Sequence, residues 1–190
     1  MALVLDGSAN TIGGLAVGGL PDGVVDTDTL ASSVALGITE ADQWRLASSV
    51  QGDVDPVTGT WERNDTSGFS KLGTGLTESS GVFSFPSTGI WQITAVAKSS
   101  HSGGNKWSEF MLYTTIDNSN WVKQTEPGGS NADHGGNAYA NSAFTFIFDV
   151  SNTTNCKVRF AINQQDGSAY LNGHSDYNTT HVTFVRLGAT

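Results

Sequence analysis

The sequence lacks the residues that several functional classes need. It has one cysteine, Cys156, among 190 residues, so an intrachain disulfide and a multi-cysteine zinc site are excluded. Only 9 lysines and arginines stand against 18 aspartates and glutamates, which gives a formal net charge of −9. Because a protein that binds the phosphate backbone needs a basic surface, we expect no nucleic-acid partner.

Long apolar runs and catalytic signatures are also missing. The opening MALVLDGS has neither the basic region nor the apolar core of a secretory signal, and no run approaches membrane-spanning length. We therefore expect assembly in a cytoplasm without membrane insertion. The sequence has no Gly-x-Ser-x-Gly elbow, no HExxH and no phosphate-binding loop. These observations predict a protein that is not an enzyme and carries no cofactor.

The most informative stretch that is present is Gly81–Lys98, GVFSFPSTGIWQITAVAK. It contains two β-rich apolar runs separated by a Pro86–Gly89 turn, because proline cannot donate to a strand ladder and glycine accepts positive φ. We expect the two runs to form a central hairpin. Both faces of the second run are largely apolar, which predicts burial on both sides, inside a sandwich and against another copy of the chain. The two faces are Trp91, Ile93 and Ala95, and Ile90, Thr94 and Val96.

The pattern G-x-F-x-F-P-x-x-G-I-W within this stretch resembles the B–C strand pair of the complement-q globular head, a TNF-like jelly roll that assembles as trimers. The resemblance covers roughly residues 40–190 and implies an all-β, two-sheet jelly-roll sandwich that forms a homotrimer. Three later segments resemble the next outer strand with its turn, the late F–G hairpin and the closing strand: Trp107–Ser119, Ala143–Val150 followed by Lys157–Asn163, and His181–Leu187.

Residues 1–40 differ from the rest, since they contain no aromatic residue, lysine or arginine. A segment this small cannot bury its own apolar side chains, so it is predicted to be an extended N-terminal anchoring arm, with residues 41–190 as the head. The alternative is a flexible leader. The opening MALVLDGS and GGLPDGVVDTD resemble the leader of small virion proteins of marine tailed bacteriophages. That resemblance implies a location on the virion surface and other virion proteins as partners of the arm.

Aromatic residues share one face of the strand at 144–148. Large buried aromatic area is typical of a sandwich core, but the family resemblance also places aromatic contacts at a threefold interface. Both alternatives stay open for the candidate core or trimer face, which consists of Trp91, Ile93, Phe144, Phe146, Phe148 and Phe184.

Three polar loops are expected at 99–107, 127–139 and 164–177, between about nine or ten strands. They combine Asn, Asp, His, Gly and a few aromatic residues, the mixture with which proteins stack on sugar rings and bind their hydroxyls. Ordinary solvated turns have a similar composition. The candidate ligand surface consists of Trp107, Asp133, His134, Tyr139, Tyr170, His174 and Tyr177.

Metal binding has little support in the sequence. The four histidines do not have the spacing of a zinc site. Complement-type heads often hold calcium near the threefold axis, but no complete calcium-binding loop is present, so we assign no ligands.

The sequence thus favours a trimeric virion protein whose arm docks on the particle and whose head attaches to a host-cell glycan, as a tail fibre or spike does. The alternative is a capsid decoration or cement trimer that stabilises the shell.

Overall fold

The structure is a computed structural model that describes residues 4–6, 11–13, 37–58 and 60–190. It divides into two compact units, Met1–Gly37 and Ile38–Thr190. In the first unit, β1 (Val4–Asp6) pairs antiparallel with β2 (Thr11–Gly13). Most of the predicted arm lies outside the described residues, so its extended form and its anchoring role stay predictions. No helix in the described part of the chain could cross a membrane.

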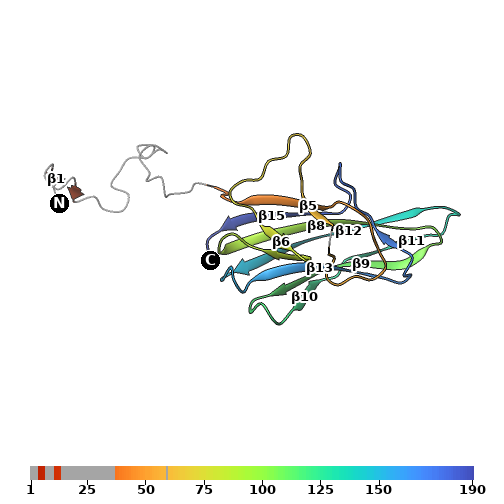
Figure 1. Ribbon diagram of the computed structural model, residues 1–190. Helices are drawn as coiled ribbons and strands as arrows, with labels where there is room; N and C mark the ends of the chain where they lie inside the picture. Colours follow the sequence, from red (N-terminus) through yellow and green to blue (C-terminus); the bar gives the residue numbers. More distant parts are fainter. Residues whose placement is uncertain (1–3, 7–10, 14–36, 59) are drawn as a thin grey trace. The chain divides into compact units, whose positions relative to one another are not determined.

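Two antiparallel sheets form the second unit, the head (Figure 1). The all-β, two-sheet jelly-roll prediction is confirmed. One sheet has seven strands in the order β4-β14-β8-β15-β3-β5, with β12 also paired to β8. Its strands are β3 (Ala41–Leu46), β4 (Val50–Gln51), β5 (Trp61–Arg63), β8 (Gly89–His101), β12 (Ala138–Val150), β14 (Tyr170–Leu171) and β15 (His181–Gly188).

The other sheet has six strands in the order β10-β9-β13-β7-β6, with β11 also paired to β9. Its strands are β6 (Thr77–Ser79), β7 (Val82–Ser84), β9 (Asn105–Thr115), β10 (Val122–Thr125), β11 (Gly128–Asn131) and β13 (Lys157–Gln164). The head therefore has thirteen strands, β3 to β15, and not the nine or ten expected.

The prediction of a central hairpin within Gly81–Lys98 is wrong. β7 pairs with β6 and β13 in one sheet, whereas β8 pairs with β12, β14 and β15 in the other. The Pro86–Gly89 turn therefore carries the chain across the sandwich. Gly89 has φ +142°, and a Cβ there would collide with the carbonyl oxygen of Gly188, so the crossing requires glycine.

The predicted late hairpin is also wrong, for the same reason. β12 belongs to the seven-stranded sheet and β13 to the six-stranded sheet, and they have different partners. In both cases the two runs present aromatic residues to one core from opposite sides. A hydrophobic pattern specifies which face is buried but not which sheet a strand joins.

The predicted polar loops contain strands. Ser99–His101 is the end of β8, β11 lies within 127–139, and β14 lies within 164–177. The end of β8 is polar yet buried, since Ser99, Ser100 and His101 are each less than a tenth exposed. An amphipathic pattern cannot reveal such strands.

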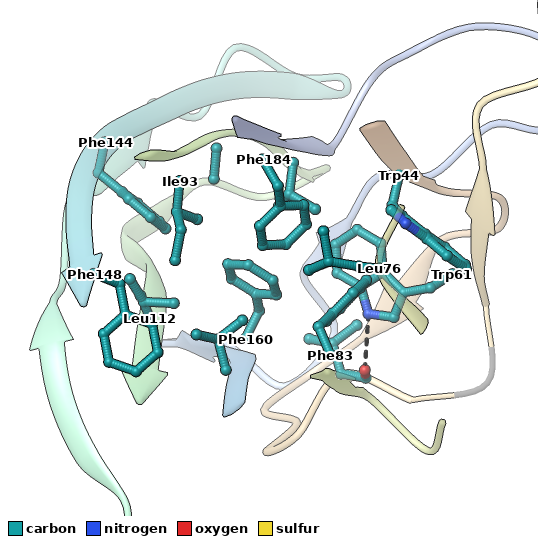
Figure 2. Packing of buried hydrophobic residues seen from close by; sticks show 14 of the residues in the cluster. Trp44, Trp61, Leu76, Phe83, Ile93, Leu112, Phe144, Phe148, Phe160 and Phe184 are labelled. Atoms are coloured by element: carbon teal, nitrogen blue, oxygen red, sulfur yellow. Dashed lines mark hydrogen bonds between the residues drawn. The ribbon is translucent and has the colours of Figure 1, made fainter. Parts of the chain in front are cut away.

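The core between the sheets is aromatic (Figure 2). The Phe160 ring lies 5.6 Å from the rings of Phe83 and Phe110, and the Phe85 ring lies 5.1 Å from Trp91. Burying each such side chain contributes roughly 1.5–3 kcal/mol. All six residues of the candidate core or trimer face belong to this core or pack against it. Trp91, Ile93, Phe144, Phe148 and Phe184 are buried, and Phe146 is partly buried.

β8 has a second face, which the chain leaves half exposed. Its side chains alternate between fully buried residues and half-buried residues such as Ile90 and Val96. Neighbouring strands continue this outer face through Ile147, which is 51% exposed, and Val185. One chain alone therefore covers only one of the two apolar faces of β8.

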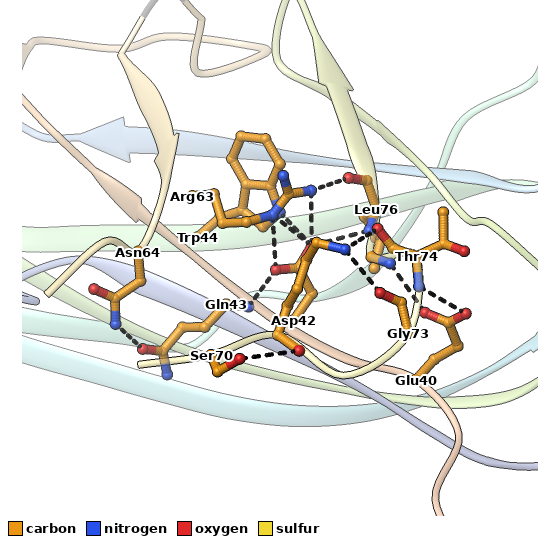
Figure 3. Close-up of polar contacts among 12 residues, drawn as sticks. Glu40, Asp42, Gln43, Trp44, Arg63, Asn64, Ser70, Gly73, Thr74 and Leu76 are labelled. Atoms are coloured by element: carbon orange, nitrogen blue, oxygen red, sulfur yellow. Dashed lines mark hydrogen bonds and ion pairs between the residues drawn. The ribbon is translucent and has the colours of Figure 1, made fainter. Parts of the chain in front are cut away.

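A buried ion pair closes the side of the head at β3 and β5 (Figure 3). Asp42 is 2% exposed and accepts hydrogen bonds from Arg63 Nε, Trp44 Nε1 and the backbone nitrogen of Leu76 at 2.9–3.0 Å. This carboxylate joins β3 and β5 to the segment that precedes β6.

Candidate functional site at the loop end of the head

Exposed apolar side chains are segregated between the two ends of the sandwich. We call the end at which β8 begins, at Gly89, the base, and the end at which β8 finishes, at His101, the loop end. Among the described residues of the head, each exposed large aliphatic residue lies toward the base: Ile38, Leu72, Ile116, Val122, Ile147 and Leu187. Three exposed large aromatic residues of the described head lie toward the loop end, namely Trp107, Tyr139 and Tyr170, whereas Tyr177 lies in the connection between β14 and β15.

The three loops predicted from the sequence converge on one open pocket at the loop end. Its volume is about 490 Å³, within the roughly 300–1,000 Å³ typical of small-molecule sites. The β8–β9 connection, β11 with the following loop, and the segment after β13 all contribute. The lining residues are Gly103, Gly104, Asn105, Lys106, Ser130, Asn131, Ala132, Asp133, Gln165 and Asp166.

Buried amide side chains hold this pocket in shape. Asn131 is 4% exposed, and its Nδ2 donates to the carbonyl oxygens of Ala138 at 3.0 Å and Ser99 at 3.4 Å. Asn105 is 1% exposed and accepts from the backbone nitrogen of Asp166 at 3.1 Å. Each asparagine therefore links two of the converging segments.

Gln164 supports the same region from beneath. Its Nε2 donates to the carbonyl oxygens of Gly52 and Ala169, both at 3.1 Å, and its Oε1 accepts from Ser108 Oγ at 3.2 Å. The side chain is 3% exposed. Because a buried amide is costly unless it is hydrogen-bonded, these bonds fix the ends of β9 and β13 relative to one another.

The pocket carries two carboxylates, those of Asp133 and Asp166. Ser168 donates to Asp166 Oδ1 from its hydroxyl at 2.6 Å and from its backbone at 2.8 Å, and these bonds lower the pKa of Asp166 below its usual value. His101 Nε2 lies 3.5 Å from Asp166 Oδ2 and 2.9 Å from Ser168 Oγ. Asp133 Oδ1 accepts from the backbone nitrogen of Gly135 at 3.0 Å.

The structure brings only part of the predicted ligand surface into this pocket. Asp133 lines the pocket, whereas His134 and Trp107 are exposed and are not among its lining residues. Tyr139 and Tyr170 both pair with Ser100, one on each side of β8, and Lys98 Nζ lies 4.2 Å from the Tyr139 ring centroid. The rings of His174 and Tyr177 stack on each other, 3.9 Å apart.

Sequence reasoning missed the buried residues that organise the pocket, namely His101, Asn105, Asn131 and Gln164. One signal was available. Val158, Phe160 and Ile162 alternate inward along β13, and Gln164 continues that alternation as a polar residue facing the core. Such a residue predicts a buried amide that needs partners.

Within the described residues, no three His, Cys, Asp or Glu side chains gather where they could hold a metal ion. Asp53 Oδ1 accepts from the backbone nitrogen of Gln164 at 2.6 Å, and Asp55 Oδ2 pairs with Arg159 at 3.1 Å.

No protein-family model and no curated protein sequence matches this chain. Solved structures do match. Eiger TNF from S. frugiperda is 12% identical, with a TM-score of 0.60, over 82% of this chain and 96% of that one. Murine APRIL at pH 8.0 is 13% identical, with a TM-score of 0.55, over 78% and 98% of the two chains. The head therefore has the TNF-like jelly-roll fold.

Proposed function

We propose that the chain is a non-enzymatic, homotrimeric structural protein of a tailed-phage virion, whose head attaches to a host-cell glycan. The main support for this proposal is that exposed aromatic and exposed aliphatic side chains lie at opposite ends of the head. Aromatic residues, which stack on sugar rings, lie toward the loop end beside a polar pocket, whereas aliphatic residues lie toward the base. The described head begins at Ile38, which is itself one of the exposed aliphatic residues of the base.

Two unpartnered surfaces support a trimer. The outer face of β8 and β15 presents half-buried residues such as Ile90, Val96 and Val185. β12 pairs with β8 over thirteen residues without a register shift, and its other edge has no strand partner in the described part of the chain. Asp149 is the only charged residue of this long, unbroken edge strand, and such an edge invites association unless it is covered. An edge on one copy that packs on the face of the next gives a heterologous contact, which closes into a ring of three when the rotation between neighbouring copies is a third of a turn.

A capsid decoration or cement role is the second candidate. The exposed aliphatic residues of the base favour this role as well, since they could be buried against the subunits of a capsid shell. That role gives no reason for the polar pocket and the three exposed aromatic residues at the loop end, Trp107, Tyr139 and Tyr170. The loop end therefore favours attachment.

Three measurements test the proposal. Mass photometry of the full chain at micromolar concentration should give three times the monomer mass of 19.9 kDa. A glycan array should give reproducible hits. Antibody labelling of virions should mark a fibre tip or spike. A mass equal to that of the monomer would contradict the proposed homotrimer. Uniform labelling of the capsid shell without glycan hits would favour the decoration role.

A further inference from the structure

The pocket at the loop end has a lining that suits a polyhydroxylated ligand. Its side chains include amides, carboxylates, a serine hydroxyl and one ammonium group, so both hydrogen-bond donors and acceptors are present. The amides of Asn105 and Asn131 are already bonded within the protein and form a fixed floor. Rigid placement of this kind lowers the entropy lost on binding.

The side chains with spare bonding capacity lie around the rim. Asp133 Oδ1 accepts a hydrogen bond from the backbone nitrogen of Gly135, and its Oδ2 remains available as an acceptor. Gln165 Oε1 accepts from the backbone of Lys106 at 3.1 Å. Within the described residues, the Gln165 amide nitrogen and the Lys106 ammonium make no hydrogen bond, so both remain available to a ligand. A sugar hydroxyl both donates and accepts, so a vicinal pair of hydroxyls matches a carboxylate beside an amide or an ammonium group.

Electrostatics limit which sugars can enter. Asp133 and Asp166 contribute two negative charges to the lining against the single positive charge of Lys106, and the whole chain carries a net charge of −9. The bonds from Ser168 keep Asp166 ionised under ordinary conditions. A carboxylate or sulfate on a ligand would meet like charges at close range, which disfavours binding.

We infer that this pocket binds the terminal residue of an uncharged glycan and excludes glycans that end in a carboxylate or a sulfate. This inference rests on the proposed function, because it assigns the ligand class and the residues of the attachment site.

The experiment uses the full chain on an array that carries glycans ending in galactose, glucose and N-acetylglucosamine beside sialylated and sulfated counterparts. Affinity for the neutral glycans should exceed that for the acidic ones at least tenfold. Asp133→Asn keeps the acceptor for Gly135 but loses the charge-assisted bond, so binding of neutral glycans should weaken roughly tenfold. Asp133→Lys should raise the binding of the sialylated probes. Asp176→Asn, an exposed carboxylate outside the pocket, should change neither.

The outcomes separate this inference from the proposed function. Equal or tighter binding of the acidic glycans overturns the inference but leaves a glycan-binding head. Neutral binding that neither Asp133 variant alters places the ligand elsewhere, on the exposed aromatic residues for example, and also overturns it. An array without hits overturns both.

Discussion

Asp42 and Arg63 form an ion pair between adjacent strands, with 3.0 Å between Asp42 Oδ1 and Arg63 Nε. The carboxylate is fully buried, whereas the Arg63 side chain is 34% exposed and lies with its guanidinium 4.7 Å from the Trp44 ring centroid. The arginine thus covers the carboxylate and leaves part of its own charge in water, which limits the cost of burial.

Asp42→Ala should destabilise the head by about 3 kcal/mol, the lower part of the range for breaking a buried ion pair. The variant leaves the Trp44 indole N–H and the Leu76 backbone N–H without their acceptor. Denaturant unfolding followed by tryptophan fluorescence measures the change. The control, Asp176→Ala, removes an exposed carboxylate and should stay within about 0.5 kcal/mol of wild type. Similar stabilities for the two variants would contradict the role given to Asp42.

Phe160→Ala should cost about 3–5 kcal/mol, because it opens a cavity where the two sheets meet. Phe160 is fully buried and its ring neighbours include those of Phe83 and Phe110. The same substitution at Phe69, which is only partly buried in a connection, should cost clearly less. Unfolding free energies from the same denaturant series decide the comparison.

Asn131→Ala should loosen the loop end. It removes the donor to the carbonyls of Ala138 and Ser99, and leaving buried carbonyls unpaired costs about 1–3 kcal/mol. Hydrogen exchange should accelerate in residues 99–105 and 132–138. Asn137→Ala, an exposed change in the same loop, should leave exchange unchanged. Unaltered exchange in the first variant would show that the buried amide does not hold the pocket.

Acid should weaken the head through His181. Burial lowers the pKa of this histidine below its ordinary value of 6.5. The unfolded chain then binds the proton more readily than the folded one, so stability falls as the pH drops through 6.5. His181→Gln should flatten the loss of stability between pH 7.5 and 5.5, whereas His134→Gln, on an exposed loop, should not. Equal pH dependence in both variants would refute the assignment.

Ile147→Lys should shift the protein from trimer to monomer without unfolding it. Ile147 is 51% exposed on the outer face of β12, where a buried lysine would be unpaired in the proposed interface. Ile116→Lys places the same charge on a more exposed isoleucine, which directly follows β9 of the other sheet, and should leave the trimer intact. Mass photometry and circular dichroism measure assembly and folding separately. A trimeric Ile147→Lys would place the interface elsewhere.

The alternation of side chains was enough to predict the buried faces of β8 and β13. Apolar residues occupy every second position there, as in Trp91 and Ile93 or Val158 and Phe160, and these are the buried positions. This alternation could not predict that the Pro86–Gly89 turn crosses between sheets. A turn connects two runs that are adjacent in the sequence. Whether these two runs also pair as strands of one sheet depends on strands that are distant in the sequence.

Composition predicted which loops form the candidate site but not which residues shape it. The loops at 99–107, 127–139 and 164–177 do meet at one pocket. The residues that shape it are buried amides at strand ends, and some of their partners lie far away in the sequence, such as Gly52 for Gln164 and Asp166 for Asn105. A polar residue with a distant partner looks the same in the sequence as one that faces water.

The pairing of β3 with β15 also bears on how the head folds. Gln43 Nε2 donates to Thr183 Oγ1 across 140 residues, and β15 lies between β8 and β3 in the middle of its sheet. On a ribosome, β3 emerges long before the strand it needs, so the seven-stranded sheet cannot close until β15 has been made. Closure over such a distance is slow. The unpaired edge of β12 is meanwhile open, so nascent chains that are close together on one message would be the first partners available to cover it.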